Sequence, residues 1–299
     1  MVRLTPRFWF SAVLVILVLL LGFVGPLIYR VDPFAEVGGL YDPPSADAPL
    51  GTDNIGHDVL ANLMVGTRTS LTIGLVAGTI ASVIGVVIGT LAGYMRGWVE
   101  EGLMGVTNVV LAIPSIVVLI LLSIALGSKT LFTMAFIIGI TSWPWTARAV
   151  RAQTNSVATR EHIDVARLSG ARTPSMLVFD VLPYLLSYVV MAFVLQISGA
   201  ILAEAGLSLL GLGPSSGTSL GIMLHWALAW GSVQSGAWWA FVPPTLVLTV
   251  IAFALLLMQA SLDEVFNPRL RGGRSGKEVA PRAGAAVLVD APEPVEERR

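Results

Sequence analysis

Six long apolar stretches constrain the fold of this chain more than any other feature. They cover residues of about 8–30, 69–95, 104–126, 131–149, 186–211 and 241–262. About 20 apolar residues cross the hydrocarbon of a bilayer as a helix, and only a helix or a closed barrel satisfies its backbone hydrogen bonds there. The sequence therefore predicts an all-α, polytopic membrane protein with six transmembrane helices.

The composition agrees with a lipid environment. Hydrophobic residues make up 55% of the chain and charged residues 12%, where a soluble domain carries about 25% charged residues. The net charge of -1 indicates no nucleic-acid partner, and the absence of cysteine excludes disulfides and thiolate metal sites. The first apolar stretch is longer than the roughly 7–15 residues of a signal-peptide core, so we expect it to remain as a membrane anchor.

The distribution of basic residues predicts the orientation. If the N-terminus is cytoplasmic, the inner segments are 1–7, 96–103, 150–185 and 263–299. Together with Arg148 at the end of a span, they hold 15 of the 18 Lys and Arg residues. Cytoplasmic loops are enriched in Lys and Arg, so both termini are predicted to be cytoplasmic.

Small residues and prolines predict how the apolar helices pack and bend. Glycines recur at four-residue steps, with one slip, in the stretch 69–95: Gly74, Gly78, Gly85, Gly89 and Gly93. A face of small residues lets helices approach closely in lipid, so this helix is predicted to be closely packed. Pro114 and Pro144 lie inside the third and fourth stretches, where proline kinks or loosens a helix.

The chain divides into three parts. An N-terminal helix and outer loop occupy 1–68, and a core of five helices occupies 69–271, including a long cytoplasmic loop at 150–185. The tail 272–299 is rich in Gly, Pro, Ala and charge and is predicted to be disordered. An uncharged outer stretch, 213–240, holds four tryptophans that suit either an aromatic belt at the membrane interface or a surface for a partner.

The loop 150–185 predicts a short amphipathic helix. Small or apolar residues lie between its charged ones: Ile163, Ala166, Leu168 and Gly170. Gly170 can end the helix by adopting a left-handed conformation. Such a helix, with Glu161, Asp164 and Arg167 on it, can fit a groove on a soluble partner or lie on anionic lipid through its arginines. The residues alone leave both readings open.

The spacing within this loop resembles the signature of ABC importer permeases. That signature reads Glu-Ala-Ala, three residues, Gly, nine residues, and Ile-x-Leu-Pro. Here Asp164-Val165-Ala166 holds the first place, Gly170 the second and Leu182-Pro183 the last, while Val165 and Asp180 depart from the pattern. The resemblance implies that residues 160–183 couple the chain to ATPase subunits.

Three further segments resemble C-type subunits of the oligopeptide, dipeptide and nickel ABC importers. They are 50–71, in which His57 replaces the usual Arg, 200–213, and 263–271. The resemblance implies a type I ABC importer permease fold in a bacterial inner membrane, forming half of a translocation pathway. The implied cargo is a dipeptide or oligopeptide, with nickel or another small solute as the alternative.

The same resemblance implies several partners. They are a homologous B-type permease, two ABC ATPase subunits, an extracytoplasmic substrate-binding protein, the peptide and the lipid bilayer. ATP and Mg would be bound by the ATPase subunits, so this chain is expected to hold no cofactor or metal and to be non-catalytic. The glycine-rich segment 272–278 lacks the spacing of a phosphate-binding loop and follows no strand.

Glu204 is the only ionisable residue well inside an apolar stretch. A carboxylate is expensive in lipid, so Glu204 marks either a structural tie or a contact with a peptide amino group in the pathway. An intramembrane enzyme would need a second catalytic group beside it, and an ion-coupled secondary transporter would need several ionisable groups near the midplane. The histidines His57, His162 and His225 are far apart in sequence, so we expect no metal site.

Overall fold

Helices make up most of the residues that the computed structural model describes, which are 5–127, 130–215 and 217–266. The helices are α1 (Pro6–Leu19), α2 (Gly25–Ile28), α3 (Val59–Met95), α4 (Gly97–Ala112), α5 (Ser115–Leu126), α6 (Leu131–Ala158), α7 (Glu161–Leu168), α8 (Thr173–Met176), α9 (Leu182–Leu209), α10 (Leu220–Ala229) and α11 (Trp238–Phe266). π-Helical turns, Leu20–Val24 and Leu177–Val181, join α1 to α2 and α8 to α9. The predicted all-α fold is confirmed.

Four helical runs are long and apolar enough to cross a membrane. They are Pro6–Ile28, Val59–Met95, Thr173–Leu209 and Trp238–Val265. The bent pair α4 and α5 would make a fifth span. The predicted stretch 131–149 lies in α6, which does not reach the same test of length and composition; α6 includes Arg148 and Arg151 and continues to Ala158. The described residues thus show a helix at each predicted stretch, and four or five of these qualify as spans.

Pro114 breaks the third predicted stretch instead of kinking it. The helices α4 and α5 meet at 84°, and Ile113, between them, has an extended ψ of 129°. Proline has no N–H to donate and disfavours the helical conformation of the residue before it. The predicted disruption at Pro114 is therefore confirmed, and it is a sharp break between two helices, whereas Pro144 stays inside a continuous α6.

Two helices begin earlier than the apolar pattern predicts. The helix α3 starts at Val59 because Asp58 caps it, with Oδ1 accepting a hydrogen bond of 2.9 Å from the N–H of Ala61. The helical run that contains α9 starts at Thr173. Within this run, Leu182 and Pro183 form the first turn of α9. The predicted disordered tail, 272–299, lies outside the described residues.

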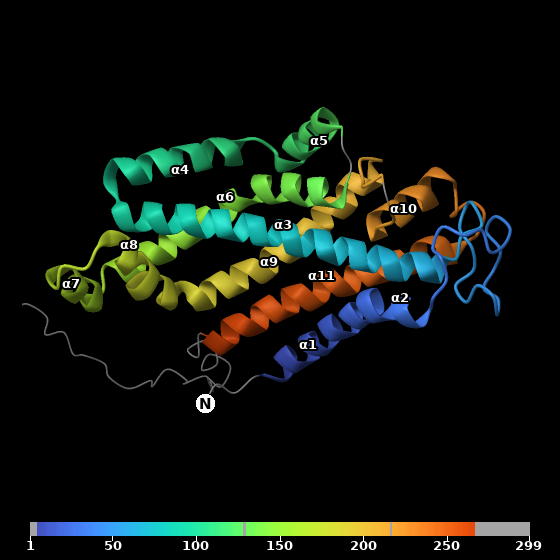
Figure 1. Ribbon diagram of the computed structural model, residues 1–299, viewed down its shortest axis with the longest axis horizontal. Helices are drawn as coiled ribbons and strands as arrows, with labels where there is room; N and C mark the ends of the chain where they lie inside the picture. Colours follow the sequence, from blue (N-terminus) through green and yellow to red (C-terminus); the bar gives the residue numbers. More distant parts are fainter. Residues whose placement is uncertain (1–4, 128–129, 216, 267–299) are drawn as a thin grey trace, which may run out of the picture. The chain divides into compact units, whose positions relative to one another are not determined.

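The helix α3 packs between α6 and α9 through its glycines (Figure 1). A Cβ atom on Gly74 would lie 2.3 Å from Cγ1 of Ile201 in α9, and one on Gly89 would lie 2.5 Å from the carbonyl oxygen of Ala147 in α6. The slip in the glycine repeat marks a change of partner: Gly74 and Gly78 face α9, whereas Gly85, Gly89 and Gly93 face α6. The predicted close packing is confirmed.

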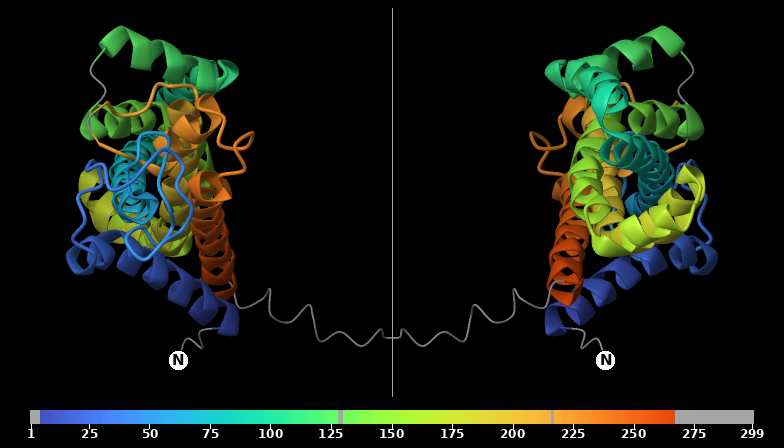
Figure 2. Two further views of the ribbon diagram at one scale, coloured as in Figure 1. Left: turned by 90° about the vertical axis from the view of Figure 1, so that its right-hand side faces the viewer. Right: turned by 90° about the vertical axis from the view of Figure 1, so that its left-hand side faces the viewer.

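The peripheral helices lie on opposite sides of this core. Figure 2 shows α4 and α5 on one side and α1 on the other. An ion pair of 3.1 Å between Arg7 and Glu264 joins the start of α1 to the end of α11. In Figure 1 these two ends lie toward the end that carries α7, while α10 and the loop 31–58 lie at the other.

The close contact at Gly89 yields a stability prediction. Gly89→Ala places a methyl group against a backbone oxygen, so α3 and α6 must separate, which costs about 1–3 kcal/mol. Gly105→Ala in α4 is the matched control, because its Cβ would meet no atom within 4 Å. Unfolding of the purified chain by titration with SDS should show a loss for Gly89→Ala and none for Gly105→Ala. Equal stability of the two variants would contradict the packing described here.

Candidate functional site

The helix α7 has one buried face and one exposed face. Ile163 is fully buried in a cluster with Val150, Val157, Met176, Val181 and Leu185. Ala166 is half-buried and packs against the same cluster, whereas Val165 and Leu168 are 62% and 90% exposed. The predicted amphipathic helix is therefore present, and it offers two apolar side chains at the surface.

Gly170 ends α7 in the way the sequence predicts. Its φ is +78°, its N–H donates to the carbonyl of Arg167 at 3.0 Å, and the N–H of Ala171 donates to the carbonyl of Ala166 at 3.2 Å. These two bonds define a Schellman motif. A Cβ atom on Gly170 would meet nothing within 4 Å, so the backbone angle requires glycine here and crowding does not.

Side chains fix α7 to the ends of α3 and α9. The guanidinium of Arg167 donates to the hydroxyl of Tyr94 at 3.4 Å and lies 5.2 Å from the centre of its ring. This hydrogen bond raises the pKa of Arg167 above its ordinary value, so the group stays charged. The ring of His162 lies 4.5 Å from that of Tyr184, and Asp164 pairs with Arg167 at 3.5 Å.

The structure thus gathers the predicted coupling residues at one end of the helices. Asp164, Ala166, Arg167 and Gly170 belong to α7 or its cap, and Glu161 lies in its first turn. The π-helical turn before Leu182 and Pro183 packs against α7.

Glu204 is fully buried and accepts three hydrogen bonds from serines. Ser70 of α3 donates to Oε2 at 2.9 Å, and Ser208 and Ser219 each donate to Oε1 at 2.7 Å. Ser70 also accepts a hydrogen bond of 3.2 Å from the N–H of Leu220. This group, which we call the Glu204 cluster, joins α3, α9 and the start of α10 within one chain.

No pattern in the sequence pairs Glu204 with these serines. Ser70 and Ser208 lie in the segments 50–71 and 200–213 that resemble known permeases, but serines are common and no spacing relates them. Ser219 is also the N-cap of α10, where its Oγ accepts a hydrogen bond from the N–H of Ile222 at 3.1 Å.

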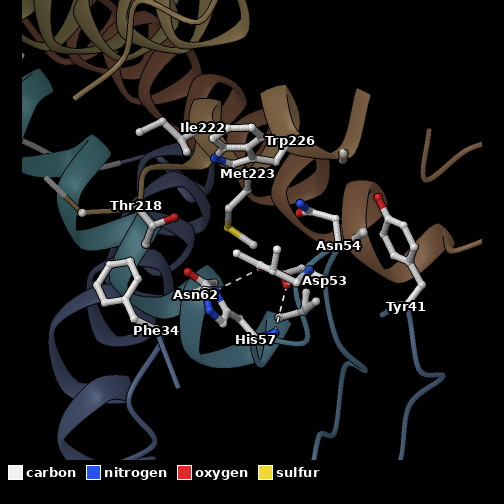
Figure 3. A pocket seen from close by; sticks show the side chains of 15 residues that line it. Phe34, Tyr41, Asp53, Asn54, His57, Asn62, Thr218, Ile222, Met223 and Trp226 are labelled. Carbon is white, nitrogen blue, oxygen red and sulfur yellow. Dashed lines mark hydrogen bonds and ion pairs between the residues drawn. The ribbon is translucent and has the colours of Figure 1, made fainter. Parts of the chain in front are cut away.

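A pocket that the sequence does not predict lies at the end of the helices away from α7. A cavity of about 170 Å³ lies between the loop 31–58, the start of α3 and α10 (Figure 3). Polar and aromatic side chains line it, among them Phe34, Tyr41, Asp53, His57, Asn62 and Trp226. Nδ1 of His57 lies 3.6 Å from Asp53, whose Oδ1 accepts the backbone N–H groups of Ile55 and His57 at 2.9 Å.

Specific contacts hold the loop 31–58 on the helices. The hydroxyl of Tyr29 donates to Asp58 at 2.6 Å. Burial, this hydrogen bond and the neighbouring negative charge raise the pKa of Tyr29 to about 12, so the phenol stays protonated at physiological pH. Nε1 of Trp239 donates to the carbonyl of Thr52 at 3.0 Å. One tryptophan of the uncharged stretch therefore secures the loop.

The histidines are dispersed. His57 lines the pocket shown in Figure 3, and the ring of His162 lies against that of Tyr184 in α9. Nδ1 of His225 lies 2.9 Å from the carbonyl oxygen of Leu209. Within the described part of the chain, no group of three His, Cys, Asp or Glu side chains could hold a metal ion.

Comparison with known proteins identifies the family. Residues 85–272 match the model of the binding-protein-dependent transport system inner membrane component. The chain is 32% identical to the dipeptide transport system permease protein DppC of Bacillus subtilis, over 77% of this chain and 71% of that protein. It is 30% identical to the oligopeptide transport system permease protein OppC of the same organism, over 87% and 84% of the two chains.

A solved structure shows the same fold. A chain of the inward-facing MetNI methionine ABC transporter matches with a TM-score of 0.54 at 18% identity, over 68% of this chain and 96% of that chain. The fold is that of a type I ABC importer permease. The chain thus belongs to the family of inner membrane components of binding-protein-dependent transport systems.

The Glu204 cluster yields a prediction from two substitutions at one site. Glu204→Gln keeps an oxygen that can accept from Ser208 and Ser219, so assembly and most transport should remain. Glu204→Leu removes the acceptor and leaves buried hydroxyl groups unsatisfied, at a cost of about 1–3 kcal/mol for each. Complex yield and uptake should fall for Leu only. Loss of uptake by an intact Glu204→Gln complex would instead place Glu204 in the pathway.

Proposed function

We propose that this chain forms half of the translocation pathway of an ATP-driven importer for dipeptides or oligopeptides. Two relatives that it matches over most of their length carry peptide transport in their names. The observation that carries the coupling role is α7, a rigidly capped helix that presents Val165 and Leu168 outward at one end of the helices.

The proposed assembly contains four membrane and ATPase subunits. A homologous B-type permease pairs with this chain, two ATPase subunits bind ATP and Mg on the cytoplasmic side, and a substrate-binding protein delivers peptide from outside. This chain is non-catalytic in the scheme.

The proposed orientation places α7 and both termini in the cytoplasm. The partition of 15 to 3 basic residues supports it. The ion pair of Arg7 with Glu264, toward the α7 end, supports it independently, because it places the start of α1 and the end of α11 on the same side, as the assignment requires.

We propose that α7 transmits ATPase motion as one body with the ends of α3 and α9. The outer face, with Val165 and Leu168, would lie in a groove of an ATPase subunit. The inner face is fixed through Ile163 and through Arg167 on Tyr94. A push on α7 would therefore displace α3 and α9 instead of bending the loop. In this scheme Ala166 serves the inner contact, and Glu204 ties the helices at the outer half of the membrane.

The exposed face of α7 yields the test of this proposal. Leu168→Glu puts a charge where an apolar side chain would be buried, so we expect ATPase subunits to be lost from the purified complex and uptake to fall at least about tenfold, since burying an unpaired charge is costly. Insertion of the permease should be unaffected, because Leu168 is 90% exposed in this chain.

Leu40→Glu is the matched control. Leu40 is 72% exposed on the outer loop, so the same substitution there should leave ATPase copurification unchanged. Equal ATPase content in the two variants would remove α7 from the interface and favour its binding to anionic lipid. Loss of ATPase with Leu40→Glu alone would reverse the orientation.

A further inference from the structure

The helix α1 packs along α11 and approaches α3 through the π-helical turn Leu20–Val24 that follows it, which leaves a groove between α1, α3 and α11. In that turn, a Cβ atom on Gly22 would lie 3.0 Å from the backbone nitrogen of Arg68 in α3. At the start of α1, Arg7 pairs with Glu264 of α11. Between these contacts α1 diverges from α3 toward α11, which is visible in Figure 1.

The groove has a volume of about 260 Å³ and an apolar lining. We call it the α1 groove, and its walls include Val15, Leu19, Phe23, Leu71, Leu75 and Ile251. Thr72 also lines it, but its hydroxyl donates to the carbonyl of Arg68 at 2.7 Å and is satisfied within α3. The groove thus offers no polar group along its length.

A single cation lies at the outer end of the groove. The guanidinium of Arg68 is 5.9 Å from the centre of the Phe23 ring, which lines the groove. Arg68 is exposed, and within residues 5–127, 130–215 and 217–266 no carboxylate pairs with it. Arg68 and Thr72 are four residues apart and share one face of α3.

The length of α3 places this cation at the surface of the hydrocarbon. With 37 residues, α3 is about 55 Å long at a rise of about 1.5 Å per residue, whereas the hydrocarbon is about 30 Å thick. A centred helix therefore extends about 12 Å beyond it at each end. Arg68 lies nine residues after Val59, which is about 14 Å along the helix. Arg68 therefore lies at the edge of the hydrocarbon, from which its long side chain can reach lipid phosphate and glycerol groups.

We propose that the α1 groove binds one glycerophospholipid of the outer leaflet. The guanidinium of Arg68 donates to the phosphodiester, for which its planar fork of N–H groups is suited. One acyl chain extends from there along Phe23, Leu19 and Leu75 toward the midplane. A bound lipid fills the space between α1 and α3 and supplies the anion that Arg68 lacks within the described chain.

The test uses the assembled importer in nanodiscs of phosphatidylcholine with a small fraction of phosphatidylglycerol that carries a photoactivatable group on one acyl chain. After illumination, mass spectrometry should find the lipid attached to peptides that line the α1 groove. Arg68→Gln should lower this attachment at least about fivefold, because a charge-assisted hydrogen bond is lost. Arg68→Lys should retain part of it, and excess inorganic phosphate should not compete.

Arg30→Gln is the matched control, because Arg30 is an exposed arginine at the same end whose Nε donates to the carbonyl of Leu27 and which does not line the groove. Its lipid attachment should equal that of the wild type. Thr72→Trp keeps Arg68 but fills the groove, so it should also abolish lipid attachment. If Arg68→Gln does not assemble, the result for Thr72→Trp tests the proposal.

Undiminished attachment in both Arg68→Gln and Thr72→Trp would overturn the proposal. Absence of lipid from the groove peptides of the wild-type assembly, while peptides elsewhere on the chain are labelled, would overturn it as well.

Discussion

Close approach of α3 to α6 and α9 is the constraint on which the rest of the structure depends. In lipid, helices gain little from hydrophobic burial, so dispersion between closely packed surfaces must hold them together. Glycines at Gly74, Gly78, Gly85, Gly89 and Gly93 supply that approach along α3. Because the glycine face changes partner between Gly78 and Gly85, one straight helix fixes two neighbours at once.

Both candidate functional elements are attached to this helix. Ser70, one turn before Gly74, donates to Glu204, and Tyr94, one residue after Gly93, contacts Arg167 of α7. The buried carboxylate and the capped surface helix are therefore connected through about 36 Å of α3, at a rise of about 1.5 Å per residue. Under the proposed coupling scheme, a displacement at α7 would reach the Glu204 cluster along α3 without a flexible loop between them.

Much of the fold follows from the sequence because its physical causes are local. Apolar runs of span length predict helices, and a glycine after an amphipathic segment predicts the Schellman end of α7 at Gly170. The sequence predicts a kink at Pro114 and not a break, since a proline alone does not show whether the helix continues through it, as it does at Pro144. The early start of α3 depends on one capping side chain, Asp58, which hydropathy does not detect.

The candidate sites are harder to predict from the sequence, because they depend on contacts between residues that are far apart in the chain. Glu204 was recognisable as costly in lipid, but its partner Ser70 is 134 residues away. The pocket in Figure 3 forms where the loop 31–58 lies against α10, and no periodicity in the sequence predicts that contact. The sequence predicts that α7 is amphipathic. Only the packing of the helix shows that Ala166 faces inward and Leu168 outward.

The central claim is that ATP hydrolysis moves peptide through a pathway to which this chain contributes. The most direct measurement is accumulation of a labelled oligopeptide in proteoliposomes that hold this permease, its partner permease and two ATPase subunits, with the binding protein outside and ATP inside. We expect accumulation with ATP and none with a non-hydrolysable analogue. Accumulation that persists without hydrolysis, or transport of nickel in place of any peptide, would contradict it.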